Sequence, residues 1–196
     1  MAASENRRAR TRASRSAWYV VQVNTGREEA MCAEIRRVCT DYDQTAKPQD
    51  KVNLAECFSP KFQGRRKWKG EWQDLQRPLL PGYVIADAQN PAALMQALRN
   101  VRGFCRLLAA EETYAPLDEK ERAWVDARTQ GADRVIPLSF GVKEGDTYTV
   151  TEGPLKGKEG IITRVDRKNC MAHLEFHVGP MTVKATVGLV IMAKSD

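Results

Sequence analysis

The sequence predicts an α+β protein, in which an antiparallel sheet covered by helices is followed by a small β-barrel. Strand-like and helix-like runs alternate as far as residue 128, whereas only short strands separated by turns follow residue 137. The 196 residues provide for two small domains, and a hydrophobic content of 42% is typical of a folded chain.

The first elements are a strand at 17–23, where aromatic and β-branched residues follow one another, and a helix. The helix is expected because Thr25 and Glu28 have the spacing of a capping box. Its apolar stripe is formed by Met31, Ile35 and Val38. Arg36 and Arg37 are expected in the last turn, where they would suit the helix dipole.

The next segment is read as turns and strands. Residues 40–50 are polar, a strand-like run follows at 54–62, and the chain is expected to reverse in a basic loop at 64–70. A turn at 79–82 then leads into a buried strand at 83–86.

The last N-terminal elements are a helix, a strand and another helix. Asn90 and Pro91 form a helix start, with an N-cap and proline at the first position. A strand is expected at 104–108, and Asp118 with Glu121 is expected to cap the helix that contains Trp124. The order β-α-β-β-α-β-α predicts helices against an antiparallel sheet.

The C-terminal region contains short strands only, as in a small β-barrel. These strands are expected at 147–151, 160–165, 172–176, 181–185 and 189–192, with a turn at Gly188. The preceding segment lacks periodicity and is interpreted as a linker. The predicted organisation is therefore a tail at 1–16, domains at 17–128 and 138–196, and a linker at 129–137.

The formal net charge of +6 is unevenly distributed. Residues 1–16 contain five arginines against one glutamate, a net +4, and almost no apolar residues, so we expect them to be disordered. Three interpretations stay open for this tail: a solubilising segment, a basic arm that attracts nucleic-acid phosphates, or a transit peptide without the usual apolar face.

Composition also restricts the class of protein. No run approaches the roughly 18 apolar residues of a transmembrane helix, so no membrane partner is expected. The five cysteines are scattered without a C-x-x-C spacing, which argues against a disulfide framework or a zinc site and favours a cytoplasmic protein.

The sequence contains no complete catalytic motif. The run at 152–159 resembles a phosphate loop, but Glu152 and Glu159 occupy its first glycine and its Ser/Thr positions. His173 and His177 are expected about 13 Å apart on one strand, too far to share a metal ion. We therefore expect a binding protein with no catalytic residue, metal or cofactor.

Basic turns of the expected barrel are candidates for RNA binding. Residues 153–168 carry five basic side chains against two acidic ones, a net +3, on turns that we expect at one end of the barrel. The candidate RNA-binding residues are Lys156, Lys158, Arg164, Arg167 and Lys168. Solvated turn lysines are the plainer explanation. The loop at 65–69 also mixes charge with an aromatic residue, as nucleic-acid grooves do.

A third class of function is protein–protein contact. Leu80 and Tyr83 lie beside the rigid turn at Pro81, and an exposed patch there would mark a docking surface. Burial in the core is the alternative explanation for some of these side chains.

The segments at 18–23, 81–84 and 101–108 together resemble the N-terminal (NGN) domain of the NusG transcription factors. Residues 150–162, with their regularly spaced glycines, are similar to the KOW motif that opens the C-terminal barrel of that family. The resemblance covers about 17–194. Within the family, 153–162 and 166–168 look most like LoaP, a specialised paralogue used for processive antitermination.

The resemblance implies a bacterial, monomeric elongation factor whose NGN domain binds the β′ clamp helices of RNA polymerase. The family's polymerase-binding surface maps to Tyr19, Leu80, Pro81, Tyr83 and Phe104. The aromatic pair that usually precedes Pro-Gly-Tyr is Leu79-Leu80 here, so aromatic stacking is lost.

The resemblance also implies a partner for the C-terminal domain. LoaP-like members use the KOW domain on a structured nascent RNA hairpin, which the basic turns favour here. The alternatives are a general NusG factor that couples polymerase to the ribosomal protein NusE or to Rho, and, more distantly, a ribosome-associated KOW protein.

Overall fold

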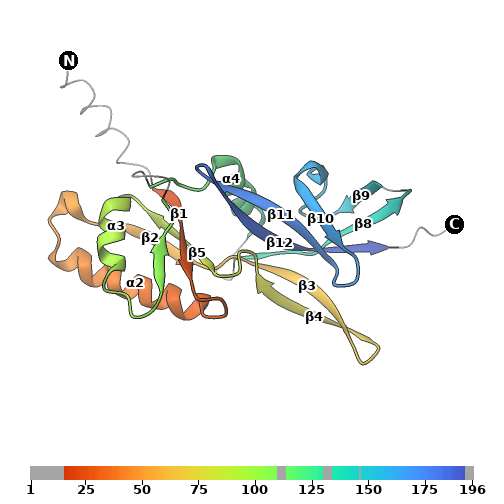
Figure 1. The fold of residues 1–196 in the computed structure, drawn as a ribbon, viewed down its shortest axis with the longest axis horizontal. Coiled ribbons are helices and arrows are strands. Elements are labelled where there is room, and N and C mark those ends of the chain that lie inside the picture. Colours follow the sequence, from red (N-terminus) through yellow and green to blue (C-terminus); the bar gives the residue numbers. More distant parts are fainter. Residues whose placement is uncertain (1–15, 110–113, 130–133, 146, 193–196) are drawn as a thin grey trace, which may run out of the picture. The chain divides into compact units, whose positions relative to one another are not determined.

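The computed structural model describes residues 16–109, 114–129, 134–145 and 147–192, and these form two compact units (Figure 1). The first unit comprises the described residues up to Phe58 together with Gly82–Leu117. The second comprises Ser59–Pro81 and the residues from Asp118 onward. The segment 59–81 therefore packs with the C-terminal part of the chain. The predicted tail lies outside the described residues except for Ser16.

A four-stranded antiparallel sheet forms the first unit, in the order β2-β5-β1-β6. Its strands are β1 (Ala17–Val23), β2 (Leu54–Phe58), β5 (Tyr83–Ala88) and β6 (Cys105–Leu107). Helices α2 (Glu28–Thr45) and α3 (Pro91–Leu98) supply much of the buried cluster against this sheet. The predicted α+β class is confirmed for this unit.

The start of α2 differs from the prediction. Arg27 is the N-cap residue and no side chain caps the helix, so the capping box of Thr25 and Glu28 was wrong. The buried Glu28 carboxylate instead accepts a hydrogen bond of 2.9 Å from the backbone N–H of Gly82. Burial acts to raise the pKa of Glu28. Backbone N–H donors, that of Gly82 among them, lower it by more, so the net shift of the pKa is downward. Glu28 thus ties the helix to the start of β5.

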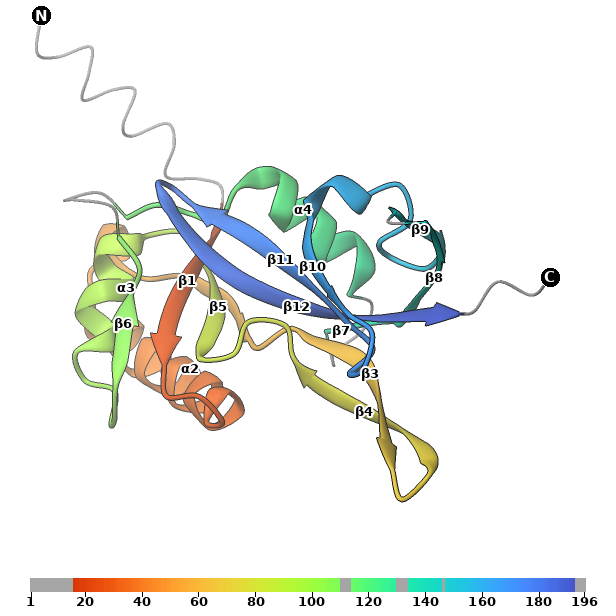
Figure 2. The same cartoon turned by 45° about the vertical axis from the view of Figure 1, so that its right-hand side comes forward.

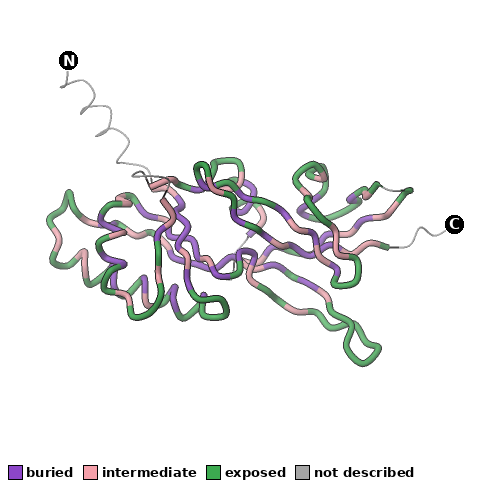
Figure 3. The backbone as a smooth tube through the Cα atoms, viewed as in Figure 1, coloured by how far each residue is buried: buried purple, intermediate pink, exposed green. Residues whose placement is uncertain are grey.

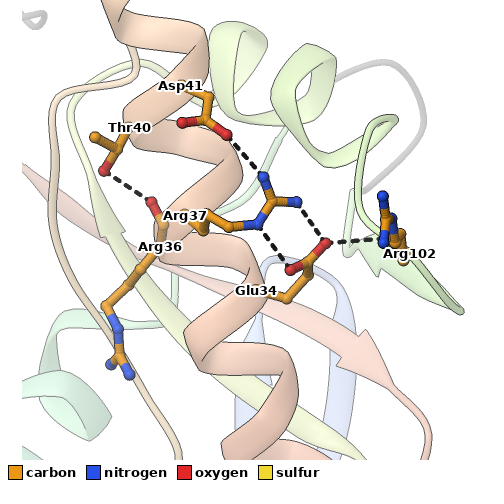
Figure 4. Close-up of polar contacts among 6 residues, drawn as sticks. All are labelled: Glu34, Arg36, Arg37, Thr40, Asp41 and Arg102. Carbon is orange, nitrogen blue, oxygen red and sulfur yellow. Dashed lines mark hydrogen bonds and ion pairs between the residues drawn. The ribbon is translucent and has the colours of Figure 1, made fainter.

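Helix α2 is also longer than predicted. It ends at Thr45 and is followed by a short 3-10 helix, η1 (Pro48–Asp50), so the polar segment at 40–50 is largely helical. Arg37 lies in the middle of the helix, not in its last turn, and bridges Glu34 at 2.8 Å and Asp41 at 2.7 Å (Figure 4). Such i,i+3 and i,i+4 ion pairs stabilise the solvent-facing side of the helix.

The starts of the other two helices follow the prediction. Asn90 caps α3, accepting from the N–H of Ala93 at 3.1 Å. Asp118 caps α4 (Glu119–Arg128), accepting from the N–H of Lys120 at 2.8 Å. None of the helices in the described part of the chain is long and apolar enough to cross a membrane.

The second unit contains a curled five-stranded sheet in the order β10-β11-β12-β8-β9. Its strands are β8 (Ser139–Glu144), β9 (Thr147–Glu152), β10 (Ile162–Asp166), β11 (Met171–Val178) and β12 (Met181–Met192). This half-barrel confirms the predicted C-terminal β architecture. The turn expected at Gly188 was wrong, because β12 runs through it. Strand β8 was not anticipated.

A β-hairpin from the middle of the chain belongs to the same unit. Its strands, β3 (Lys61–Trp68) and β4 (Glu71–Pro78), are joined by a two-residue turn at Lys69 and Gly70. The basic loop expected at 64–70 is therefore mostly strand. Within the expected linker, β7 (Val135–Ile136) pairs in parallel with β3, while 130–133 lie outside the described residues. The sequence-order domains 17–128 and 138–196 stay a prediction.

Gly188 is where the hairpin meets the C-terminal sheet. Strand β12 pairs with β11 up to Gly188 and with β8 from Leu189 onward. A Cβ atom at Gly188 would overlap the backbone carbonyl oxygen of Gln63 in β3 and the Leu138 side chain. Only glycine lets β3 lie this close to β12.

We expect Gly188→Ala to destabilise the protein by about 1–3 kcal/mol, because the added methyl group must displace the backbone of β3. Urea unfolding measures this change. The matched control is Gly160→Ala, since a Cβ there meets open space. We expect the control to change the free energy of unfolding by less than about 0.5 kcal/mol. Equal stability of the two variants would contradict the packing described.

Candidate functional site

All five candidate RNA-binding side chains are exposed, and among the described residues none of them forms an ion pair. The turn between β9 and β10 carries Lys156 and Lys158, β10 carries Arg164, and the turn between β10 and β11 carries Arg167 and Lys168. The two turns therefore lie at opposite ends of β10, roughly 13 Å long. The expectation that they share one end of the barrel was wrong.

The turn between β9 and β10 is held by buried neighbours. Gly153 has φ +96°, and a Cβ atom there would lie 2.6 Å from the Cα of Ser139. The Leu155 N–H donates to Ser139 Oγ at 3.2 Å, and Arg128 Nε of α4 donates to the Pro154 carbonyl at 3.1 Å. These contacts fix the backbone of the turn that carries Lys156 and Lys158.

Glu159 follows those lysines and begins a short 3-10 helix, η2 (Glu159–Ile161). Its carboxylate accepts from the N–H of Val150 at 3.2 Å. Backbone donors, its own N–H first, lower the pKa of Glu159. This acidic group therefore ties its own turn to the backbone of β9.

The second turn has the same arrangement. Asp166 accepts from the backbone N–H of Asn169 at 3.0 Å and from its side chain at 2.8 Å. The Asn169 side chain, followed by its backbone N–H, lowers the pKa of Asp166. Arg167 and Lys168 are exposed and form no ion pair within the described residues, so both are available to an anion.

Helix α4 also contacts β11 through an exposed ion pair. Glu121 was expected to help cap α4, but its carboxylate lies 2.8 Å from Nδ1 of His177. The hydrogen bond to Glu121 and then its charge raise the pKa of His177. The other histidine, His173, lies 3.4 Å from the Thr186 hydroxyl. Within the described ranges, no group of three or more potential ligands could hold a metal ion.

The expected polymerase-binding residues are not brought together as one exposed surface. Leu80 is 1% exposed, and the backbone of its neighbour Leu79 bonds to Pro60 and Thr186. The hypothesis of an exposed Leu80–Tyr83 patch was therefore wrong, because both leucines belong to the core.

Tyr19 is also buried, in the cluster between the sheet and its helices, and burial raises the pKa of its hydroxyl. Pro81 is exposed and Tyr83 is half-buried, whereas Phe104 is 48% exposed. Tyr83 pairs with Gln22, and Cys105, which follows Phe104, pairs with Val23. Tyr83 and Phe104 therefore lie at the same end of the first sheet.

Comparison with known proteins places this architecture in a known class. The family model described as "Transcription termination factor nusG" matches residues 16–125, and that of the KOW motif matches 144–176. A Rickettsia bellii protein named transcription termination/antitermination protein NusG is 20% identical over 179 residues, covering 91% of this chain and 90% of that protein. The Rickettsia typhi protein of the same name is 21% identical over 151 residues, covering 77% and 76%.

A solved structure described as "Domain interaction in Thermotoga maritima NusG" covers 90% of this chain and 95% of its own, with 15% identity and a TM-score of 0.48. The N-terminal α+β unit and the KOW sheet define a transcription termination/antitermination factor. The N-terminal match extends over more than half of the sequence, and the chain belongs to the NusG family. Members of this family are non-enzymatic transcription factors that work with RNA polymerase.

We expect NMR titration to give His177 a pKa above 6.5 that falls towards 6.5 in Glu121→Gln. Because the folded-state pKa is raised, the contact stabilises below pH 6.5 and is lost as the pH rises through the raised value. Glu119→Gln removes an exposed charge two residues earlier in α4 and is the control. An unchanged pKa in Glu121→Gln would contradict the pairing.

Proposed function

We propose that this protein binds RNA polymerase through its N-terminal unit and promotes processive antitermination, with the KOW sheet binding a structured nascent RNA. The observation that carries the RNA assignment is the set of five exposed basic side chains around β10, none of which is neutralised by an ion pair within the described structure. This function needs no cofactor and is consistent with a monomer in the cytoplasm.

Two basic turns at opposite ends of a strand suit a folded RNA better than a single phosphate. A stem presents phosphates along its length, so each turn can meet a different part of the backbone. The fixed turn backbones reduce the entropy that binding must remove. The nearby Glu159 and Asp166 carboxylates are held by backbone donors, and no ion pair between them and the five cations occurs within the described residues.

We expect Lys156→Ala/Lys158→Ala and Arg167→Ala/Lys168→Ala each to weaken binding to RNA stem-loops recovered by crosslinking to the nascent transcript. Each pair removes two phosphate contacts, so the slope of log affinity against log salt should become shallower by about 2. Filter binding over a salt series measures both effects.

The matched control for these pairs is Lys120→Ala/Lys184→Ala, which makes the same change in charge at exposed positions in α4 and β12. Stem-loop affinity that is unchanged in both turn pairs would refute RNA binding by this surface. Binding of NusE or Rho by the same turns would then support a general NusG role.

The polymerase contact is proposed to centre on Phe104 and Tyr83, because Tyr19 and Leu80 are buried. We expect Phe104→Asp to abolish co-purification with RNA polymerase while the circular-dichroism spectrum is unchanged. An exposed phenylalanine can be replaced without disturbing the core, and a buried charge at the interface is costly. The control is Ile161→Asp, which places the same charge at an exposed apolar residue of the second unit; the Ile161 side chain is 40% exposed. Retained co-purification of Phe104→Asp would exclude this end of the sheet.

A further inference from the structure

The tip of the β3–β4 hairpin exposes two tryptophans that the proposed function does not use. Trp68 is 52% and Trp72 53% exposed, whereas Trp18 and Trp124 are buried at 2% and 6%. The hairpin tip extends away from the other strands of the second unit in both views, and the residues at the tip are exposed (Figures 2 and 3). Two exposed indoles on one hairpin indicate a binding surface.

Each face of the hairpin combines one indole with a cation. Residues directly opposite in an antiparallel pair share a face, and Lys67 is opposite Trp72. On the other face, the Arg66 guanidinium lies 5.3 Å from the centre of the Trp68 ring, within cation–π distance. Aromatic rings next to cations are the elements from which surfaces for single-stranded nucleic acid are built.

The charge of the hairpin is strongly positive. Residues 61–78 carry six basic side chains against two acidic ones, a net +4. One of those acids, Asp74, is paired with Arg65 at 2.7 Å. Arg66, Lys67 and Lys69 are exposed at the tip, and no ion pair to them occurs within the described ranges.

A groove with both polar and apolar walls lies at the base of the hairpin, next to the Trp72 face. The groove has a volume of about 590 Å³, which is within the size range of small-molecule sites. Gln63 and Gln76 pair across the two strands and line it, and Phe140 of β8 lines it as well. Amide side chains can hydrogen-bond the edges of an unstacked base, and a phenyl ring can stack on its face.

Trp72, Asp74 and Gln76 alternate along β4, so they occupy one face at intervals of about 6.8 Å. Opposite them on β3 are Lys67, Arg65 and Gln63. From the tip towards the base, this face therefore presents three features. The first is the Trp72 ring beside Lys67, the second is the Arg65–Asp74 ion pair, and the third is the groove with its two glutamine amides.

We propose that the β3–β4 hairpin binds unpaired nucleotides, with bases stacking on Trp68 and Trp72, phosphates contacting Arg66, Lys67 and Lys69, and one base entering the groove beside Gln63 and Gln76. This surface shares no residue with the basic turns around β10 and does not depend on their binding RNA. An acidic protein partner fits less well, because it would leave the groove beside Gln63 and Gln76 without a ligand.

The test uses the full chain and single strands of about 12 nucleotides, one of oligothymidylate and one of oligouridylate, with a duplex of the same length. Binding should quench the fluorescence of the exposed indoles, since the other two tryptophans are buried. Trp68→Ala and Trp72→Ala should each weaken single-strand binding about tenfold, and the double variant more. Trp72→Phe should retain most of the affinity, because the phenyl ring still stacks.

Two controls change exposed side chains that belong to neither proposed surface. Lys120→Ala/Lys184→Ala removes two cations from α4 and β12, and Met192→Ala removes an exposed apolar side chain; both should leave single-strand affinity unchanged. Tighter binding of oligouridylate would identify RNA as the source of the unpaired nucleotides, and tighter binding of oligothymidylate would identify DNA. Unchanged affinity in the double tryptophan variant, or an equal affinity for the duplex, would overturn the proposal.

Discussion

The second unit depends on the absence of a side chain at Gly188. The carbonyl of Gln63 occupies the space that a Cβ atom would need, so β3 lies directly against β12. The same glycine is where β12 changes its partner from β11 to β8. One close backbone approach thus joins a hairpin from the middle of the chain to the C-terminal sheet. The base of the hairpin is fixed while its tip is left in solvent, which is the arrangement that a binding surface needs.

This packing has consequences for the residues on either side of the hairpin. Leu79, directly after β4, accepts a bond from Thr186 of β12 through its carbonyl, and Leu80 is buried beside it. Side chains that look like a docking surface in the sequence therefore complete a core. What stays exposed of the expected polymerase contact lies at the end of the first sheet, at Phe104 and in part at Tyr83. Burial, rather than chemical type, decides which apolar residues can meet a partner.

Helix α4 supports the KOW sheet at two places. Arg128 lies over the Trp124 ring at 5.6 Å and donates to the Pro154 carbonyl, which braces the first basic turn. Glu121 pairs with His177 near the end of β11. The carboxylates within the turns accept hydrogen bonds from local donors, and the five cations around β10 form no ion pair within the described part of the chain. Placement of charge, more than its total, makes this surface suitable for RNA.

Local patterns in the sequence determined the starts of two helices, the fold class and the family of this protein. Asn90 and Asp118 start α3 and α4 as predicted because an N-cap acts on backbone groups two or three residues away. The α+β class and the family also follow from local periodicity and motifs. Tertiary structure alone decided the burial of Leu80, the separation of the basic turns and the position of the hairpin. These depend on contacts such as that of Gly188 with Gln63, between residues more than a hundred positions apart, which no local pattern contains.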